Sequence, residues 1–162
     1  MNRFIAPILL ALMLSACGLQ PLYSGGSKGA VATTLGSVSV ATIEGKSGWL
    51  MRNALTDRLG AQDSNAAQFR LVVTLDDRIE GFGVRADDTV TRERRTLRAR
   101  YQLISVATGK TVLDATAGSD AGIDVAGSEY ATIAGENSAL ENLTQKVADQ
   151  IVTRLSIYAR GE

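Results

Sequence analysis

The sequence predicts an α+β fold: a two-layer sandwich with two helices packed on one face of a mostly antiparallel sheet of about four strands. Three observations carry this prediction. Apolar and polar residues alternate over several segments, as in half-buried strands. Other segments repeat apolar residues every three or four positions, as amphipathic helices do. The order along the chain is strand, helix, a meander of strands and a final helix, so both helices can cover the same face of the sheet.

The first sixteen residues have the layout of a signal peptide. Arg3 supplies a positive charge, and residues 4–14 form an apolar run. This run is too short to cross a bilayer, because a spanning helix needs about 20 residues. Two small residues, Ser15 and Ala16, follow it. We therefore assign residues 1–16 to a leader that takes no part in the fold.

Cys17 is the only cysteine in the chain and follows this leader directly. The tetrad LSAC at 14–17 resembles the bacterial lipobox, which implies cleavage before Cys17 and attachment of lipid to its sulfur and amino group. Stable anchoring needs at least two acyl chains, and the lipobox implies three. A buried free cysteine is the alternative. Because Gly18 follows rather than an aspartate typical of inner-membrane retention, we expect the periplasmic face of an outer membrane.

Composition argues against several classes of function. The chain has 17 Lys and Arg against 17 Asp and Glu, whereas a nucleic-acid-binding protein is usually strongly basic. It has no histidine, the commonest general base and metal ligand. The acid pairs at 76–77 and 87–88 remain, but adjacent acids on a strand point to opposite faces and acids at turns are usually solvated. We expect no enzyme activity, catalytic residues, cofactor, metal site or nucleic-acid partner.

Residues 17–34 are rich in glycine, serine and other small residues and predict an acylated N-terminal tether. The more apolar part at 20–23 leaves open that some of it packs on a surface. A single α+β domain is predicted over residues 35–162. It begins with a strand at 35–43 and a helix at 46–59, which Ser47 would cap and Gly60 would end.

The second half of the predicted sheet is a meander. A strand at 68–76 runs on to 85 with a bend at Gly81 and Gly83, and the acids at 87–88 mark a turn. Strands at 91–106 and 111–117 are joined by the turn ATGK, and a weak edge strand or a loop follows around 123–125. The final helix begins at a capping box, Ser138 with Glu141, or earlier, although Gly135 weakens an earlier start.

The strand at 91–106 carries an unusual ladder of positive charge. Its even-numbered face bears four arginines, which are Arg92, Arg94, Arg98 and Arg100. Arg95 is a fifth arginine nearby. Alternate residues lie about 6 to 7 Å apart on one strand face, and arginine forks match phosphates and carboxylates. The ladder is therefore a candidate site for anionic groups. The alternative is a solvated face whose arginines pair with Asp76, Glu80 or Asp114 on neighbouring strands.

Several phrases along the chain resemble one family. They are, in order, CGLQPLY at 17–23, TDRL at 56–59, ARYQLISVATGKTVL at 99–113, EYATIAGENSALENL at 129–143 and VADQIVTRL at 147–155. Together with the lipobox they resemble the LPS-assembly lipoprotein LptE family in its alphaproteobacterial form. The resemblance implies an outer-membrane lipoprotein that sits as a plug inside the β-barrel LptD, assists assembly of that barrel and binds lipopolysaccharide on its way to the cell surface.

The expected partners are therefore LptD, lipopolysaccharide and the membrane through the lipid anchor. The family's basic lipopolysaccharide contacts cannot be matched to particular arginines of this sequence. Assigning lipopolysaccharide or partner binding to Arg92, Arg94, Arg98 and Arg100 consequently rests on charge geometry alone. The alternative function is an anchored accessory α+β lipoprotein of another lipid-transport or secretion machine.

Overall fold

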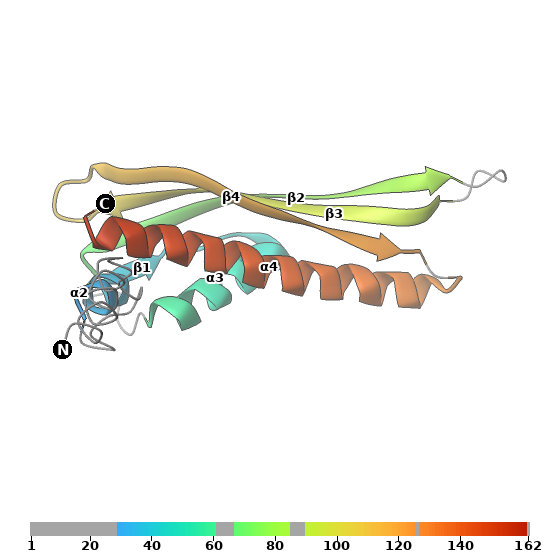
Figure 1. Ribbon diagram of the computed structural model, residues 1–162, viewed down its shortest axis with the longest axis horizontal. Coiled ribbons are helices and arrows are strands. Elements are labelled where there is room, and N and C mark those ends of the chain that lie inside the picture. Colours follow the sequence, from blue (N-terminus) through green and yellow to red (C-terminus); the bar gives the residue numbers. More distant parts are fainter. Residues whose placement is uncertain (1–28, 61–66, 85–89, 126, 162) are drawn as a thin grey trace, which may run out of the picture.

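The computed structural model has two layers, with helices lying along one face of a twisted four-stranded sheet (Figure 1). It describes residues 29–60, 67–84, 90–125 and 127–161, so the leader, Cys17 and most of the tether lie outside the described residues. The α+β class predicted from the sequence is confirmed. In chain order the elements are α2 (Ala30–Gly36), β1 (Val38–Val40), α3 (Gly45–Leu59), β2 (Phe69–Val84), β3 (Val90–Ser105), β4 (Thr111–Asp124) and α4 (Glu129–Ala159).

The sheet is a three-stranded meander with a short parallel strand at one edge. The strand order is β1-β2-β3-β4. β2 and β3 pair antiparallel without a break from Phe69 to Phe82. β4 pairs antiparallel with β3, with one irregularity between Leu103 and Ile104. The sheet is therefore mixed rather than purely antiparallel, because β1 runs parallel to β2.

The core lies between the helices and the odd-numbered side chains of β2 and β3. On β3, Leu97 and Tyr101 are at most 2% exposed, as the alternation in the sequence predicts. α4 contributes an apolar stripe with the expected spacing of three and four residues. Its fully buried members include Leu143, Val147 and Ile151, each 0% exposed. Burial of this seam removes the apolar faces of both layers from water, which is the main stabilising contribution to such a fold.

The start of the domain differs from the prediction. Residues 30–34, expected in the tether, form helix α2 together with Leu35 and Gly36, and Val31 and Leu35 are buried in the core. The expected strand at 35–43 is reduced to the three residues of β1. The α2 segment contains three β-branched residues, Val31, Thr33 and Thr34, which favour strands. Packing of α2 against α4 outweighs that local preference.

Two predicted helix caps are wrong. α3 begins at Gly45, so Ser47 lies inside it, although the predicted end at Gly60 is confirmed by a left-handed φ of 64°. α4 begins at Glu129, which is the earlier start left open above. Ser138 caps nothing there and instead donates to the Ala134 carbonyl at 3.0 Å. Gly135 is tolerated in the helix, where a Cβ would lie 3.3 Å from Ile123.

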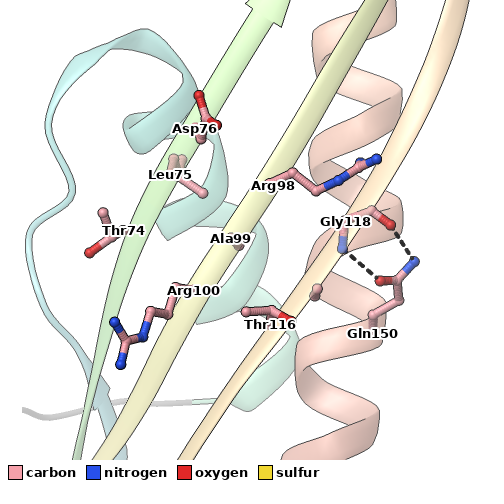
Figure 2. A pocket seen from close by; sticks show the side chains of 10 residues that line it. Thr74, Leu75, Asp76, Arg98, Ala99, Arg100, Thr116, Gly118 and Gln150 are labelled. Carbon is pink, nitrogen blue, oxygen red and sulfur yellow. Dashed lines mark hydrogen bonds between the residues drawn. The ribbon is translucent and has the colours of Figure 1, made fainter.

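β4 is one continuous edge strand rather than two segments. The edge placement is confirmed. The small residues around Gly118 hid this continuity, because small and polar residues have low strand propensity. The strand is held there by α4, whose Gln150 side chain binds the Gly118 backbone (Figure 2).

Candidate functional site

The four predicted arginines lie on the face of the sheet that the helices do not cover, which we call the open face. Even-numbered side chains of β2, β3 and β4 point to it, because odd-numbered ones fill the core. Arg92, Arg94, Arg98 and Arg100 are all exposed. β3 is the central strand between β2 and β4, so the ladder runs along the middle of the open face.

Three of the four guanidinium groups already bind aspartates of β4. Arg92 Nε lies 2.9 Å from Asp124 Oδ1, Arg98 Nη2 donates to both oxygens of Asp120 at 3.1 Å, and Arg100 Nη2 donates to Asp114 Oδ2 at 2.9 Å. Of these acids, sequence reasoning named only Asp114. Asp120 and Asp124 would have been found if residues 111–124 had been treated as one strand, because all three acids then occupy even positions.

Hydrogen bonds from this face hold two of the carboxylates ionised. The pKa of Asp114 is lowered first by the hydrogen bond from Arg100 and then by one from Gln102, whose Nε2 lies 2.8 Å from Oδ2. The pKa of Asp120 is lowered first by the hydrogen bond from Thr96 and then by that from Arg98. Donors to a carboxylate favour its charged form. The acids therefore remain available as anionic partners of the arginines in mildly acidic solution.

Arg94 differs from the other three arginines. Its guanidinium carbon lies 5.3 Å from the centroid of the Phe82 ring, a cation–π arrangement. Glu80 faces Arg94 across the strand pair. In the described part of the chain, however, no carboxylate lies within ion-pair distance of Arg94. It is the ladder member best placed to accept an external anion without first giving up an ion pair.

Arg95, expected as a fifth member nearby, lies on the opposite, helix-facing side. It binds Asp77 in a bidentate manner, with Nε–Oδ1 at 2.8 Å and Nη2–Oδ2 at 2.7 Å. Its Nη1 donates to the Glu136 carbonyl of α4 at 2.9 Å. The two side chains are only 11% and 19% exposed. Arg95 therefore ties α4 to the sheet and is not part of the open face.

A shallow groove of about 700 Å³ lies beside Arg98 and Arg100, at the middle of the sheet. Figure 2 shows the two arginines leaving β3 in opposite directions, with Arg98 reaching across β4 beside Gly118. Gly118 lets the Arg98 side chain lie flat across β4, since a Cβ at that position would come within 2.4 Å of Arg98 Cδ. Leu75, Ala99 and Ala117 contribute apolar lining, and Arg98, Arg100 and Asp76 place charges at its rim, so the groove suits an amphipathic occupant with an anionic or hydrogen-bonding group.

The open face as a whole is nearly balanced in charge. It carries a formal charge of +1, from six arginines and five carboxylates: Arg70, Arg78, Arg92, Arg94, Arg98 and Arg100 against Asp76, Glu80, Asp114, Asp120 and Asp124. This balance agrees with the alternative stated above, a face on which arginines pair with acids of neighbouring strands. The pairing acids are mainly those of β4. A partner with both donors and acceptors would fit such a surface, since each exposed pair costs little to exchange.

The acids considered for catalysis do not form a paired site. Asp76 is on the open face and binds Arg78 at 2.8 Å, whereas Asp77 is on the helix-facing side and binds Arg95. Asp87 and Asp88 lie outside the described residues. Across the residues that the structure describes, no three His, Cys, Asp or Glu side chains are grouped to hold a metal ion. In that same part, none of the helices has the length and apolar character required to cross a membrane.

A family model described as LptE, lipopolysaccharide-assembly, matches residues 35–155. The chain belongs to the LptE family. The match covers α3, all four strands of the sheet and α4 as far as residue 155. Membership of the LptE family places the chain in lipopolysaccharide assembly. No curated protein matches the chain.

Solved structures share the LptE-type fold of this chain. A protein of Caulobacter crescentus CB15 described as a lipoprotein is 24% identical with a TM-score of 0.69, covering 82% of this chain and 97% of its own. Rare lipoprotein B of Shewanella oneidensis is 12% identical with a TM-score of 0.58, covering 76% and 95%. A minor lipoprotein of Acinetobacter baumannii is 14% identical with a TM-score of 0.58, covering 75% and 89%. At these identities the similarity establishes the fold.

Proposed function

We propose that this LptE-family chain is an outer-membrane lipoprotein that plugs the LptD β-barrel, assists its assembly and takes part in inserting lipopolysaccharide into the outer membrane. The family match over residues 35–155 carries this proposal. The open face supplies the contact surface. Its exposed arginines and aspartates can form hydrogen bonds and ion pairs with the polar interior of a large barrel.

Co-purification from detergent-solubilised outer membranes tests the partner. The tagged chain should recover a large β-barrel protein that mass spectrometry identifies as LptD. Replacing Thr116 and Thr74 together by tryptophan should reduce that recovery, because both lie on the rim of the open-face groove. Tryptophan at Thr153, exposed on α4, is the matched control for added bulk. Recovery of an inner-membrane transporter in place of the barrel would favour an accessory lipoprotein of another machine.

Direct binding of lipopolysaccharide is assigned to the same ladder, with Arg94 as its main contact. Arg94→Gln should weaken binding more than Arg92→Gln, because Arg92 is already bound to Asp124. Replacing Arg98 and Arg100 together by glutamine should weaken binding too, and the loss should shrink at high salt because part of the attraction is screened. Binding to purified lipopolysaccharide is measured at low ionic strength and again at high salt. Unchanged binding in all of these folded variants would restrict the open face to a protein-binding role.

The anchor is assigned to Cys17. Cys17→Ala should abolish acylation and release the chain from membranes unless a partner retains it. Metabolic labelling with an alkyne fatty acid reads out acylation separately from membrane retention. The wild-type chain should carry label and the Cys17→Ala chain none. Label that persists on the Cys17→Ala chain would contradict the lipobox assignment.

A further inference from the structure

The two edges of the sheet are protected in different ways. At the β4 edge, Gln150 of α4 accepts from the Gly118 N–H at 3.1 Å and donates to the Gly118 carbonyl at 3.3 Å. This pair of bonds imitates what a neighbouring strand would supply. At the β2 edge, β1 pairs with Phe69–Leu71 only. Beyond that point β2 continues to Val84, and along this edge, opposite β3, no described strand pairs with it (Figure 1).

Backbone groups of β2 point outward along this uncovered edge. Ala41 N–H donates to the Leu71 carbonyl at 2.9 Å, whereas Val106 N–H on the β3 side donates to the Gln68 carbonyl. Odd-numbered residues of β2 therefore direct their N–H and C=O groups away from β3. The unbroken register with β3 extends this alternation to Asp77, Ile79 and Gly81. In the described ranges, no hydrogen bond occupies these outward groups, which makes the distal edge a template for another strand.

The side chains along the same stretch alternate in charge. Asp76, Arg78 and Glu80 follow one another on the open face, and all three are exposed. Between them, Ile79 points to the other face and remains 41% exposed. The free edge is therefore charged on the open face, as natural edges often are, but it also exposes the apolar side chain of Ile79 on the other face.

We propose that the distal edge of β2 pairs antiparallel with the same edge of a second copy of this chain, with the two-fold axis at Ile79. Arg78 of each copy then faces Glu80 of the partner copy, and the two Ile79 side chains meet. The bonds from Asp77, Ile79 and Gly81 join two four-stranded sheets into one continuous sheet. α4 covers β4 and β3 rather than this edge, so the helical layers leave room for the second copy.

The order of charges along β2 favours a second copy of this chain as the partner and fixes the register of the pairing. Shifting the axis to Arg78 would set Arg78 against Arg78 and Asp76 against Glu80, which is repulsive. Shifting it to Asp77 would set the two Asp77 carboxylates directly opposite each other. The axis at Ile79 avoids both conflicts and forms two cross-copy ion pairs. The sequence order acid, base, acid is therefore complementary to itself in an antiparallel arrangement, which is the property that an isologous two-fold contact requires.

This dimer forms between free chains, so it is independent of the proposed complex with a barrel. Charge exchange provides the test. The full-length chain, expressed with its own leader and purified in detergent, is studied by sedimentation at increasing protein concentration. The wild-type chain should dimerise. Arg78→Glu and Glu80→Arg should each weaken the dimer by roughly tenfold, since each places two like-charge pairs across the axis. The double exchange should restore the wild-type dissociation constant.

Arg52→Glu is the matched control, because Arg52 is exposed on α3 away from this edge and should leave the dimer unchanged. Thermal unfolding should be nearly the same for all variants, since the substituted side chains are exposed. A chain that stays monomeric at every concentration would overturn the proposal. It would also be overturned if both single substitutions left the dissociation constant of the dimer unchanged, or if the double variant dimerised as weakly as the single variants.

Discussion

At the scale of single residues, strand alternation determines which face of the sheet each charge occupies, but burial determines how much each ion pair contributes to stability. Arg95 and Asp77 form a bidentate pair that is 11% and 19% exposed, under α4. Arg92 and Asp124 share a single hydrogen bond, from Nε to Oδ1 at 2.9 Å, and their side chains are 63% and 82% exposed. Exposed pairs are worth about 0 to 1 kcal/mol, whereas removing one partner of a buried pair leaves a desolvated charge.

We expect Arg95→Ala to lower the free energy of unfolding by about 3 to 5 kcal/mol, because Asp77 would stay buried without its partner. Arg92→Ala should cost less than about 1 kcal/mol. Urea denaturation of both variants measures the difference. Similar small losses in the two variants would show that Arg95 does not connect α4 to the sheet.

Titration of Asp114 tests the hydrogen bonds on the open face. Arg100→Gln should raise the pKa of Asp114 toward its ordinary value of 3.8, and Gln102→Leu should raise it less, because the Arg100 bond is the larger cause. A carboxylate with a lowered pKa stabilises the fold above its unfolded pKa and loses that contribution as pH falls through the folded value. The wild-type chain should therefore lose more stability below about pH 4 than Arg100→Gln does. Carboxyl chemical shifts followed by NMR give the pKa of Asp114. If that pKa is the same in Arg100→Gln as in the wild-type chain, the Arg100 hydrogen bond is not its main cause.

At the scale of elements, long periodic segments could be predicted and short or irregular ones could not. The alternation through Leu97 and Tyr101 and the helical stripe through Leu143 and Ile151 specify the meander and the final helix, because each pattern repeats over several turns or residue pairs. The open-face ladder followed from the same alternation. The charge balance of the open face could not be predicted in this way, because Asp120 and Asp124 lie on a strand with too little apolar character to be recognised in full.

Tertiary contacts explain the remaining differences. α2 forms from β-branched residues because Val31 and Leu35 are buried by the packed helices. The start of α4 lies before Ser138 because Arg95 and Lys46 hold this part of the helix, through the Glu136 carbonyl at 2.9 Å and the Asn137 side chain at 2.6 Å. Neither cause is local in sequence. Cap signals alone therefore misplaced these boundaries.

The seam between the layers should be the main source of stability. Leu55 on α3 and Leu143 on α4 are both 0% exposed. Leu55→Asp and Leu143→Asp should unfold the chain, because an uncompensated buried carboxylate costs several kcal/mol against a total stability of about 5 to 15 kcal/mol. Asn142→Asp, at an exposed neighbouring position, is the control. Thermal midpoints lowered by only about one or two degrees in both leucine variants would show that the assigned core is wrong.

At the scale of the whole molecule, the fold separates its surfaces by role. One face of the sheet is closed by helices, and the other is open and lined with paired charges. α2 and the β3–β4 turn lie at one end of the elongated molecule, and the start of α4 lies at the other (Figure 1). The proposed anchor precedes α2. A membrane would therefore adjoin the α2 end, with the open face directed sideways to a partner.

Site-specific photo-cross-linking from Thr116 tests whether the open face contacts the LptD barrel. Thr116 is exposed on β4, directly opposite Arg100 at the groove, and a photoreactive residue there leaves the core untouched. We expect a cross-link to LptD in intact cells, formed only on irradiation and weakened when Arg98 and Arg100 are both replaced by glutamine. A folded, membrane-bound chain that cross-links from Thr116 to an inner-membrane transporter, or to no protein, would contradict it.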